Sequence, residues 1–171
     1  DETNKIVLHL GGVYQDKALA LKRFCNHYNQ LDDRIKGRLV LENDDKSYSI
    51  DEVLCVGMEE KIPVVFDNLH HAVNPGGAGK SDSHWIEACR PTWKERDGAQ
   101  KIHYSQQEPG KRPGSHSAMI RAGEFLDFYR AIPRDDIDIM LEVKDKNLSA
   151  IKCILATEKN GRTADLEREW G

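Results

Sequence analysis

The sequence has no apolar run long enough to cross a membrane. Its apolar runs, such as Ile6-Val7-Leu8 and Val64-Val65-Phe66, are short, whereas a transmembrane helix needs about 20 apolar residues. The first five residues are polar and lack the apolar stretch of a secretory signal. These absences exclude a membrane-spanning chain, and we expect a cytoplasmic protein with no membrane partner.

Paired cysteines and an excess of positive charge are also absent. The four cysteines are far apart and form no Cys-x-x-Cys pair: Cys25, Cys55, Cys89 and Cys153. We expect all four to be small buried side chains in a reducing compartment. Lys and Arg total 25 against 29 Asp and Glu, which gives a net charge of −4. This balance excludes a uniformly basic nucleic-acid coat but leaves room for a local basic groove or bound cations.

Short β-branched runs alternate with stretches of helical period, the pattern of a βα protein with a parallel sheet. With 171 residues, the chain has the size of one domain. The predicted strands cover residues 5–9, 38–42, 63–67, 100–104 and 138–142. The predicted helices cover residues 16–31, a stretch that begins at Ser49, 82–96, 122–132 and 145–158. We predict long loops at 68–81 and 105–117, the second of them functional, and assign no element to the polar tail 160–171.

Two local signals sharpen the helix boundaries. Ser49 followed by Glu52 is typical of a capping box, in which the glutamate reaches back to the first backbone amide. Pro91 predicts a kink or break in the helix at 82–96, because proline cannot donate the helical hydrogen bond.

Each predicted strand ends in a residue that can bind a metal ion. These residues are His9, Glu42, Asp67, His103 and Glu142, and successive ones are 25 to 39 residues apart. That spacing is about the length of one βα repeat. Because the carboxyl ends of parallel strands emerge on one face, the five side chains are expected to converge there. His70, three residues after Asp67, and His116, in the loop after the fourth strand, are further candidates.

A mixed set of imidazole and carboxylate groups suits Zn²⁺, Mn²⁺ or Fe²⁺, and the lack of cysteine at these positions argues against a structural zinc knuckle. Several carboxylates favour more than one cation, because they offset the repulsion between neighbouring metals. Paired cations activate a water and stabilise both oxygens of a phosphoryl displacement. The same ligands can serve a metal-dependent sugar isomerase or epimerase. A non-catalytic fragment that binds metal or DNA is a third possibility.

Several segments give the chain a resemblance to a known family. In order they are His9 to Gly12 (HLGG) and residues 41–49 (LENDDKSYS), 65–71 (VFDNLHH), 101–105 (KIHYS), 114–116 (GSH) and 141–146 (LEVKDK). From about residue 5 to residue 155 the chain resembles the UV damage endonuclease family, which is related to endonuclease IV and the xylose isomerases. The joint set of motifs is specific, although each is short.

The resemblance implies an α/β fold of TIM-barrel type, with about five of the eight βα units of a complete barrel. Residues 1–171 would then form the C-terminal part of one endonuclease domain. The implied activity is cleavage of the DNA backbone 5′ of a UV photoproduct, with divalent ions as cofactors. Mn²⁺ is preferred, Mg²⁺, Zn²⁺ and Co²⁺ are alternatives, and a complete site holds more than one ion. We expect the missing N-terminal barrel segment, or self-association, to cover the exposed edges of the sheet.

The resemblance also assigns roles to residues. The implied metal ligands are His9, Glu42, Asp67, His70, His103, His116 and Glu142, and the implied catalytic residues are Glu42, Lys101 and His103. Lys101 lies two residues before His103 and so on the same strand face. We expect it to contact phosphate or to be chemically modified into a ligand. The implied partner is UV-damaged double-stranded DNA, with candidate phosphate contacts from loop cations: Lys80, Lys111, Arg112 and Arg121.

Overall fold

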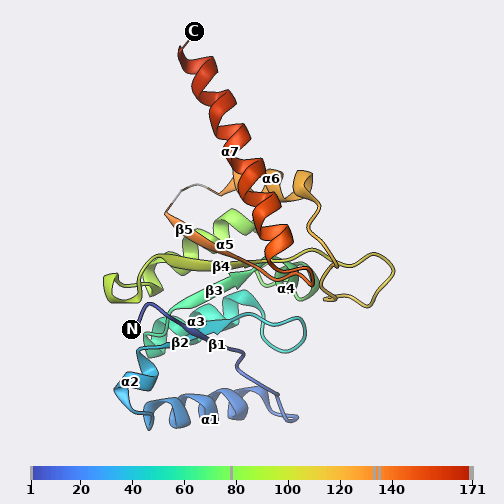
Figure 1. Cartoon of the computed structure of the whole chain (residues 1–171). Coiled ribbons are helices and arrows are strands. Elements are labelled where there is room, and N and C mark those ends of the chain that lie inside the picture. Colours follow the sequence, from blue (N-terminus) through green and yellow to red (C-terminus); the bar gives the residue numbers. More distant parts are fainter. Residues whose placement is uncertain (1, 78, 133, 135, 170–171) are drawn as a thin grey trace. The chain divides into compact units, whose positions relative to one another are not determined.

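Five strands form one sheet in the order of the chain. In the computed structural model, which describes residues 2–77, 79–132, 134 and 136–169 and only the backbone of 159–169, the strands are β1 (Ile6–Leu8), β2 (Leu39–Glu42), β3 (Val64–Asp67), β4 (Gln100–Tyr104) and β5 (Ile137–Leu141). The β1–β2, β2–β3 and β3–β4 pairs are parallel, and β1 to β4 follow the colour order in Figure 1. Sequential order without reversal is typical of a barrel rather than a doubly wound sheet. The fold is therefore a partial α/β barrel of TIM type, as predicted.

The chain divides into two compact units. Unit 1 comprises residues 1–104 and 134–140, and unit 2 comprises residues 105–133 and 141–171. The helices of unit 1 are α1 (Lys17–Asn29), α2 (Asp33–Lys36), α3 (Ile50–Glu60), α4 (Asn68–Val73) and α5 (Asp82–Cys89), with 3-10 turns at Arg90–Thr92 and Glu95–Asp97. Unit 2 contains α6 (Ala122–Ala131) and α7 (Asn147–Glu169).

The core of unit 1 lies around β2 and β3, whose residues are all buried. Burial on both faces explains why these strands consist of consecutive apolar residues up to their last position. Helix α3 packs on both strands. Its close approach requires Gly57, because a Cβ atom there would overlap the Val64 side chain. The two strands therefore end as a rigid pair, with Glu42 and Asp67 as their last residues.

All five predicted strands are confirmed, each with both ends within one residue of its predicted position. The predicted first helix begins after Asp16, whose side chain accepts a hydrogen bond from the Leu19 amide at 2.9 Å. The predicted contact of the capping box is present: Glu52 Oε2 accepts a hydrogen bond from the Ser49 backbone amide at 3.0 Å. Helix α5 ends at Cys89, two residues before Pro91, so the predicted break is confirmed.

Three predictions are wrong. Residues 68–73 form α4 rather than a loop, because Asp67 caps the helix by accepting from the His70 amide at 2.7 Å. The helix predicted to end at residue 158 continues as α7 to Glu169, so the tail, to which no element was assigned, is helical to that point, and residues 170 and 171 lie outside the described ones. Good helix formers dominate this stretch. Cys55 is exposed and Cys25 is only half-buried, whereas Cys89 and Cys153 are buried as expected. No helix in the described ranges is long and apolar enough to cross a membrane.

Candidate metal centre

The carboxyl ends of β2, β3 and β4 bring three metal-ligand side chains together. Ligand atoms of Glu42, Asp67 and His103 all lie within 4.8 Å of one another. Asp67 and His103 are directly opposite in the β3–β4 register, so their side chains point to the same face. His103 Nδ1 is hydrogen-bonded to Glu42 Oε1 at 2.8 Å. The three side chains are buried, with residue exposures of 2%, 0% and 6%, so the strands hold them in one arrangement.

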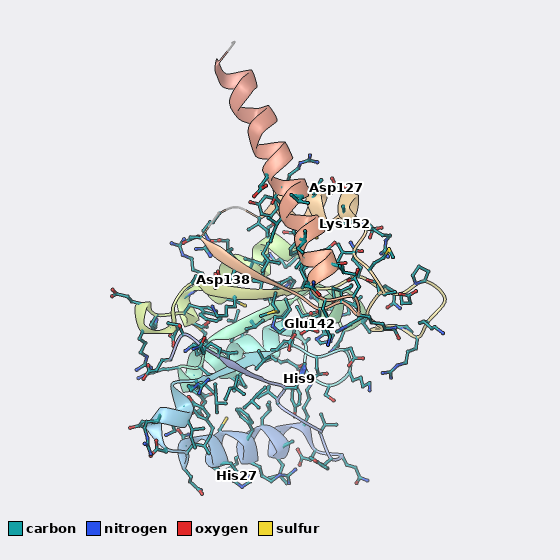
Figure 2. All side chains as sticks on the ribbon, viewed as in Figure 1. His9, His27, Asp127, Asp138, Glu142 and Lys152 are labelled. Atoms are coloured by element: carbon teal, nitrogen blue, oxygen red, sulfur yellow. The ribbon has the colours of Figure 1, made fainter. Side chains whose placement is uncertain are left out.

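A second group shares Glu42 and consists of His9, Glu42 and His70. His9 directly follows β1 (Figure 2), and its Nε2 lies 3.4 Å from Glu42 Oε2. His70 lies on α4, where its Nδ1 is 3.7 Å from Glu42 Oε1 and 3.8 Å from Asp67 Oδ1. One oxygen of Glu42 therefore faces His9, and the other faces His103 and His70. A carboxylate whose two oxygens each face other potential metal ligands is suited to lie between two cations.

The charges around His70 show that the site attracts positive charge. Burial alone lowers the pKa of the His70 imidazole, since it disfavours the charged ring. The carboxylates of Asp67 and Glu42 and the backbone carbonyl of Asn43 outweigh that effect and raise the pKa. The two buried carboxylates therefore favour a positive charge at this place. A divalent cation would supply such a charge, and the donor set of imidazoles and carboxylates fits such an ion.

In unit 2 the structure brings His116 and Glu142 to each other. His116 Nδ1 lies 3.6 Å from Glu142 Oε2, and the two side chains are 30% and 29% exposed. Glu142 follows β5 directly (Figure 2). His116 is held by an antiparallel bridge to Gln107. That this pair joins the ligands of unit 1 stays a prediction.

Lys101 and His103 line one cavity of about 660 Å³ on the sheet face that also carries Val40 and Val65. The ammonium of Lys101 donates to Asp138 Oδ2 at 2.7 Å. Asp138 lies on β5 (Figure 2), and its side chain is 62% exposed. Sequence reasoning missed Asp138, although its alternation with Met140 along β5 was a usable signal.

The candidate phosphate contacts differ in their surroundings. Lys80, Lys111 and Arg112 are exposed. Arg121 is engaged by Glu124, whose Oε2 accepts from its Nη2 at 2.9 Å. Sequence reasoning also missed Asn43, which is fully buried beside Glu42 and bonded to the backbone of Asp67.

Comparison with known proteins places these motifs in one family. A family model described as UV-endonuclease UvdE matches residues 1–163. The chain is 46% identical over 164 residues to the UV DNA damage endonuclease of Clostridium perfringens, covering 95% of this chain and 40% of that protein. It is 32% identical over 165 residues to the UV-damage endonuclease of Schizosaccharomyces pombe, covering 95% and 27% respectively.

A solved structure agrees with this assignment. The crystal structure of SacUVDE matches with a TM-score of 0.84 and 39% sequence identity, covering 92% of this chain and 52% of that one. The chain spans about half, or less, of the length of these relatives. The family model, the two relatives and the fold all agree, and the chain belongs to the UV-endonuclease UvdE family.

Proposed function

We propose that this chain carries the metal centre of a DNA repair endonuclease that hydrolyses the phosphodiester bond 5′ of UV photoproducts. The observation that carries the proposal is the sharing of Glu42 between two groups of potential ligands. The names of the relatives support UV-damaged DNA as the substrate. The proposed cofactors are divalent ions, preferably Mn²⁺, and the proposed place of action is the cytoplasm.

Each residue of the centre then has a distinct task. Bound divalent ions would lower the pKa of a coordinated water and neutralise the charge that develops on the phosphate. Glu42 lies between the two groups and holds His103 by hydrogen bond. Asp67 and His103 complete one group, and His9 and His70 complete the other. Since most of these side chains are buried at strand ends, the centre needs little reorganisation during the reaction.

His116 and Glu142 of unit 2, and Lys101 of unit 1, have further proposed roles. His116 and Glu142 supply further ligands. Lys101, two residues before His103 on β4, uses its ammonium to bind a phosphate oxygen of the substrate. Its ion pair with Asp138, at 2.7 Å, holds that ammonium in place while no DNA is present.

A braced loop in unit 2 supports phosphate contacts by Lys111 and Arg112. The Gln107 side chain donates from Nε2 to the carbonyls of Glu108 and Arg112, both at 3.0 Å. Its Oε1 accepts from the Gly114 amide at 2.8 Å. One side chain thus fixes the loop that presents two exposed cations. Lysine and arginine on a fixed loop suit the DNA backbone, which positions a protein without reading sequence.

Selectivity for damage follows from the cost of removing bases from the stack. A photoproduct is more weakly stacked and paired than normal bases, so less free energy is needed to rotate it out of the duplex. The parts of the barrel outside this chain, or a second copy, are proposed to cover the edge at β1, where Ile6 and Val7 are 47% and 36% exposed.

The test is nicking of a UV-irradiated, end-labelled duplex by this chain with added Mn²⁺, beside undamaged duplex. The expected result is a cut directly 5′ of the lesion that chelator and Glu42→Gln abolish. If the chain alone does not cut, addition of the N-terminal segment of a relative should restore nicking. Ketose–aldose interconversion without any response to DNA would contradict the proposal and favour a sugar isomerase.

A further inference from the structure

Asn43 forms two hydrogen bonds to the backbone of one candidate ligand. Its side chain is fully buried, with 0% exposure. Asn43 Nδ2 donates to the Asp67 carbonyl at 3.0 Å, and Asn43 Oδ1 accepts from the Asp67 amide at 2.9 Å. The amide and carbonyl of a strand residue point to the same side in a parallel sheet. Both of these groups of Asp67 therefore face β2 and end on the Asn43 side chain.

The register of the two strands explains why a side chain is needed there. In the β2–β3 pair, Glu42 lies opposite Val65, two residues before Asp67. The backbone ladder between the strands thus ends before Asp67, although Asp67 is buried. A buried amide or carbonyl without a partner is costly. The side-chain amide of Asn43, the residue after Glu42, supplies the next pair of hydrogen bonds between the two strands.

The backbone of Asn43 contacts a second candidate ligand. His70 Nδ1 donates to the Asn43 carbonyl at 2.9 Å. A carbonyl only accepts, so Nδ1 carries the hydrogen, and in the neutral ring the lone pair is on Nε2. Metal-binding histidines commonly donate their other ring nitrogen to a carbonyl or carboxylate, which fixes the tautomer and the ring orientation.

We propose that Asn43 is a positioning residue of the metal centre. Its side chain sets the place of Asp67 relative to Glu42, and its carbonyl orients His70. One residue thereby links the end of β2 to candidate ligands from β3 and α4. Its side-chain amide supplies both the donor and the acceptor that the backbone of Asp67 requires. This inference rests on the metal-binding part of the proposed function and not on the nature of the substrate.

The test compares Asn43→Ala with Asn74→Ala. Asn74 is a matched control because its Nδ2 donates to a backbone carbonyl, that of Asp44, at 3.0 Å, yet its side chain bonds no candidate ligand. Mn²⁺ affinity is measured by titration, the visible absorption of bound Co²⁺ reports ligand geometry, and urea unfolding in EDTA gives stability without metal.

Asn43→Ala is expected to weaken Mn²⁺ binding by about 10- to 100-fold, the range that partners of metal ligands show, and to alter the Co²⁺ spectrum. Asn74→Ala should leave both unchanged even if it lowers stability. If Asn43→Ala does not fold, Asn43→Ser, which places one shorter polar group there and cannot bridge both backbone groups of Asp67, is expected to show the same loss in milder form.

Wild-type Mn²⁺ affinity and a wild-type Co²⁺ spectrum in a folded Asn43 variant would overturn the inference and leave a purely structural role. A wild-type chain that binds neither ion would overturn it as well. A wild-type chain that binds Mn²⁺, shows the expected loss in Asn43→Ala and yet cuts no DNA would contradict the endonuclease proposal alone, with the positioning role supported.

Discussion

The two sets of candidate ligands are built in different ways. In unit 1, Glu42 and Asp67 terminate buried strands and are 2% and 0% exposed. In unit 2, His116 comes from a loop and Glu142 follows a partly exposed strand, and both side chains are about 30% exposed. Buried carboxylates need a compensating positive charge, whereas half-exposed ones are solvated. From this difference we expect the strand ends to bind a cation rigidly and the loop residues to make a weaker contribution.

The largest expected effect comes from Glu42→Gln. Because Glu42 belongs to both groups of unit 1, its replacement should lower Mn²⁺ affinity by about 100-fold or more, at or beyond the upper end of what partners of metal ligands cost. Nicking should fall far more than DNA binding. Titration calorimetry measures Mn²⁺ affinity, nicking of end-labelled UV-irradiated duplex measures cutting, and a gel-shift assay measures DNA binding. Glu59→Gln, the same change on the exposed face of α3, is the control, and equal losses of binding and cutting would count against the assigned role.

His116→Ala is expected to have a smaller effect on the same affinity. A half-exposed ligand should contribute about tenfold, or about 1.4 kcal/mol. The matched control is His27→Ala, since His27 is exposed on α1 (Figure 2). A loss as large as that of Glu42→Gln would break the distinction between the two sets of ligands.

Loss of the Gln107 hydrogen bonds that hold the loop should weaken DNA binding without changing how strongly that binding depends on salt. In Gln107→Ala both cations remain, so affinity is expected to fall about threefold while the dependence of log K on log salt stays the same. Lys111→Ala, by contrast, should reduce the salt slope by about 0.9 for each lost phosphate contact. Fluorescence anisotropy over a range of salt concentrations measures both. A lower slope in Gln107→Ala would refute the bracing role.

The smallest expected difference concerns local opening around one buried cysteine in each unit. Rates of thiol labelling compare the two units without any substitution. Burial raises the pKa of the Cys89 thiol in unit 1 to about 12, and burial also raises the pKa of Cys153 in unit 2. Helix α7 exposes Leu148, Ile151 and Ile154 around Cys153, so local opening there should be easier. Native-state labelling at pH 8 is expected to modify Cys55 first, Cys153 next and Cys89 only on unfolding. Equal rates for Cys89 and Cys153 would show no difference in rigidity.

Much of the fold and of the site follows from local pattern in the sequence. The β-branched runs predict where the strands begin and end. The same runs place Glu42 and Asp67 at the ends of their strands. Helix α4 escaped prediction because its capping residue, Asp67, is also the last residue of a strand. Local pattern assigns each residue to one element, and Asp67 belongs to two.

The contacts that escaped prediction depend on register between strands. Asn43 meets Asp67 only because Glu42 pairs with Val65 and the ladder then ends. Lys101 and Asp138 are 37 residues apart and meet across β4 and β5. No periodicity within one segment determines how far one strand is shifted against the next, so such partners require the three-dimensional structure.

Anomalous X-ray diffraction from crystals of this chain grown with Mn²⁺ tests most directly whether Glu42 is shared by cations at the strand ends. The predicted result is an anomalous peak about 2.2 Å from a Glu42 oxygen, with Asp67 and His103 or His9 and His70 as its other ligands. Anomalous peaks confined to other parts of the surface, with the 2.8 Å bond between His103 and Glu42 intact, would contradict the account.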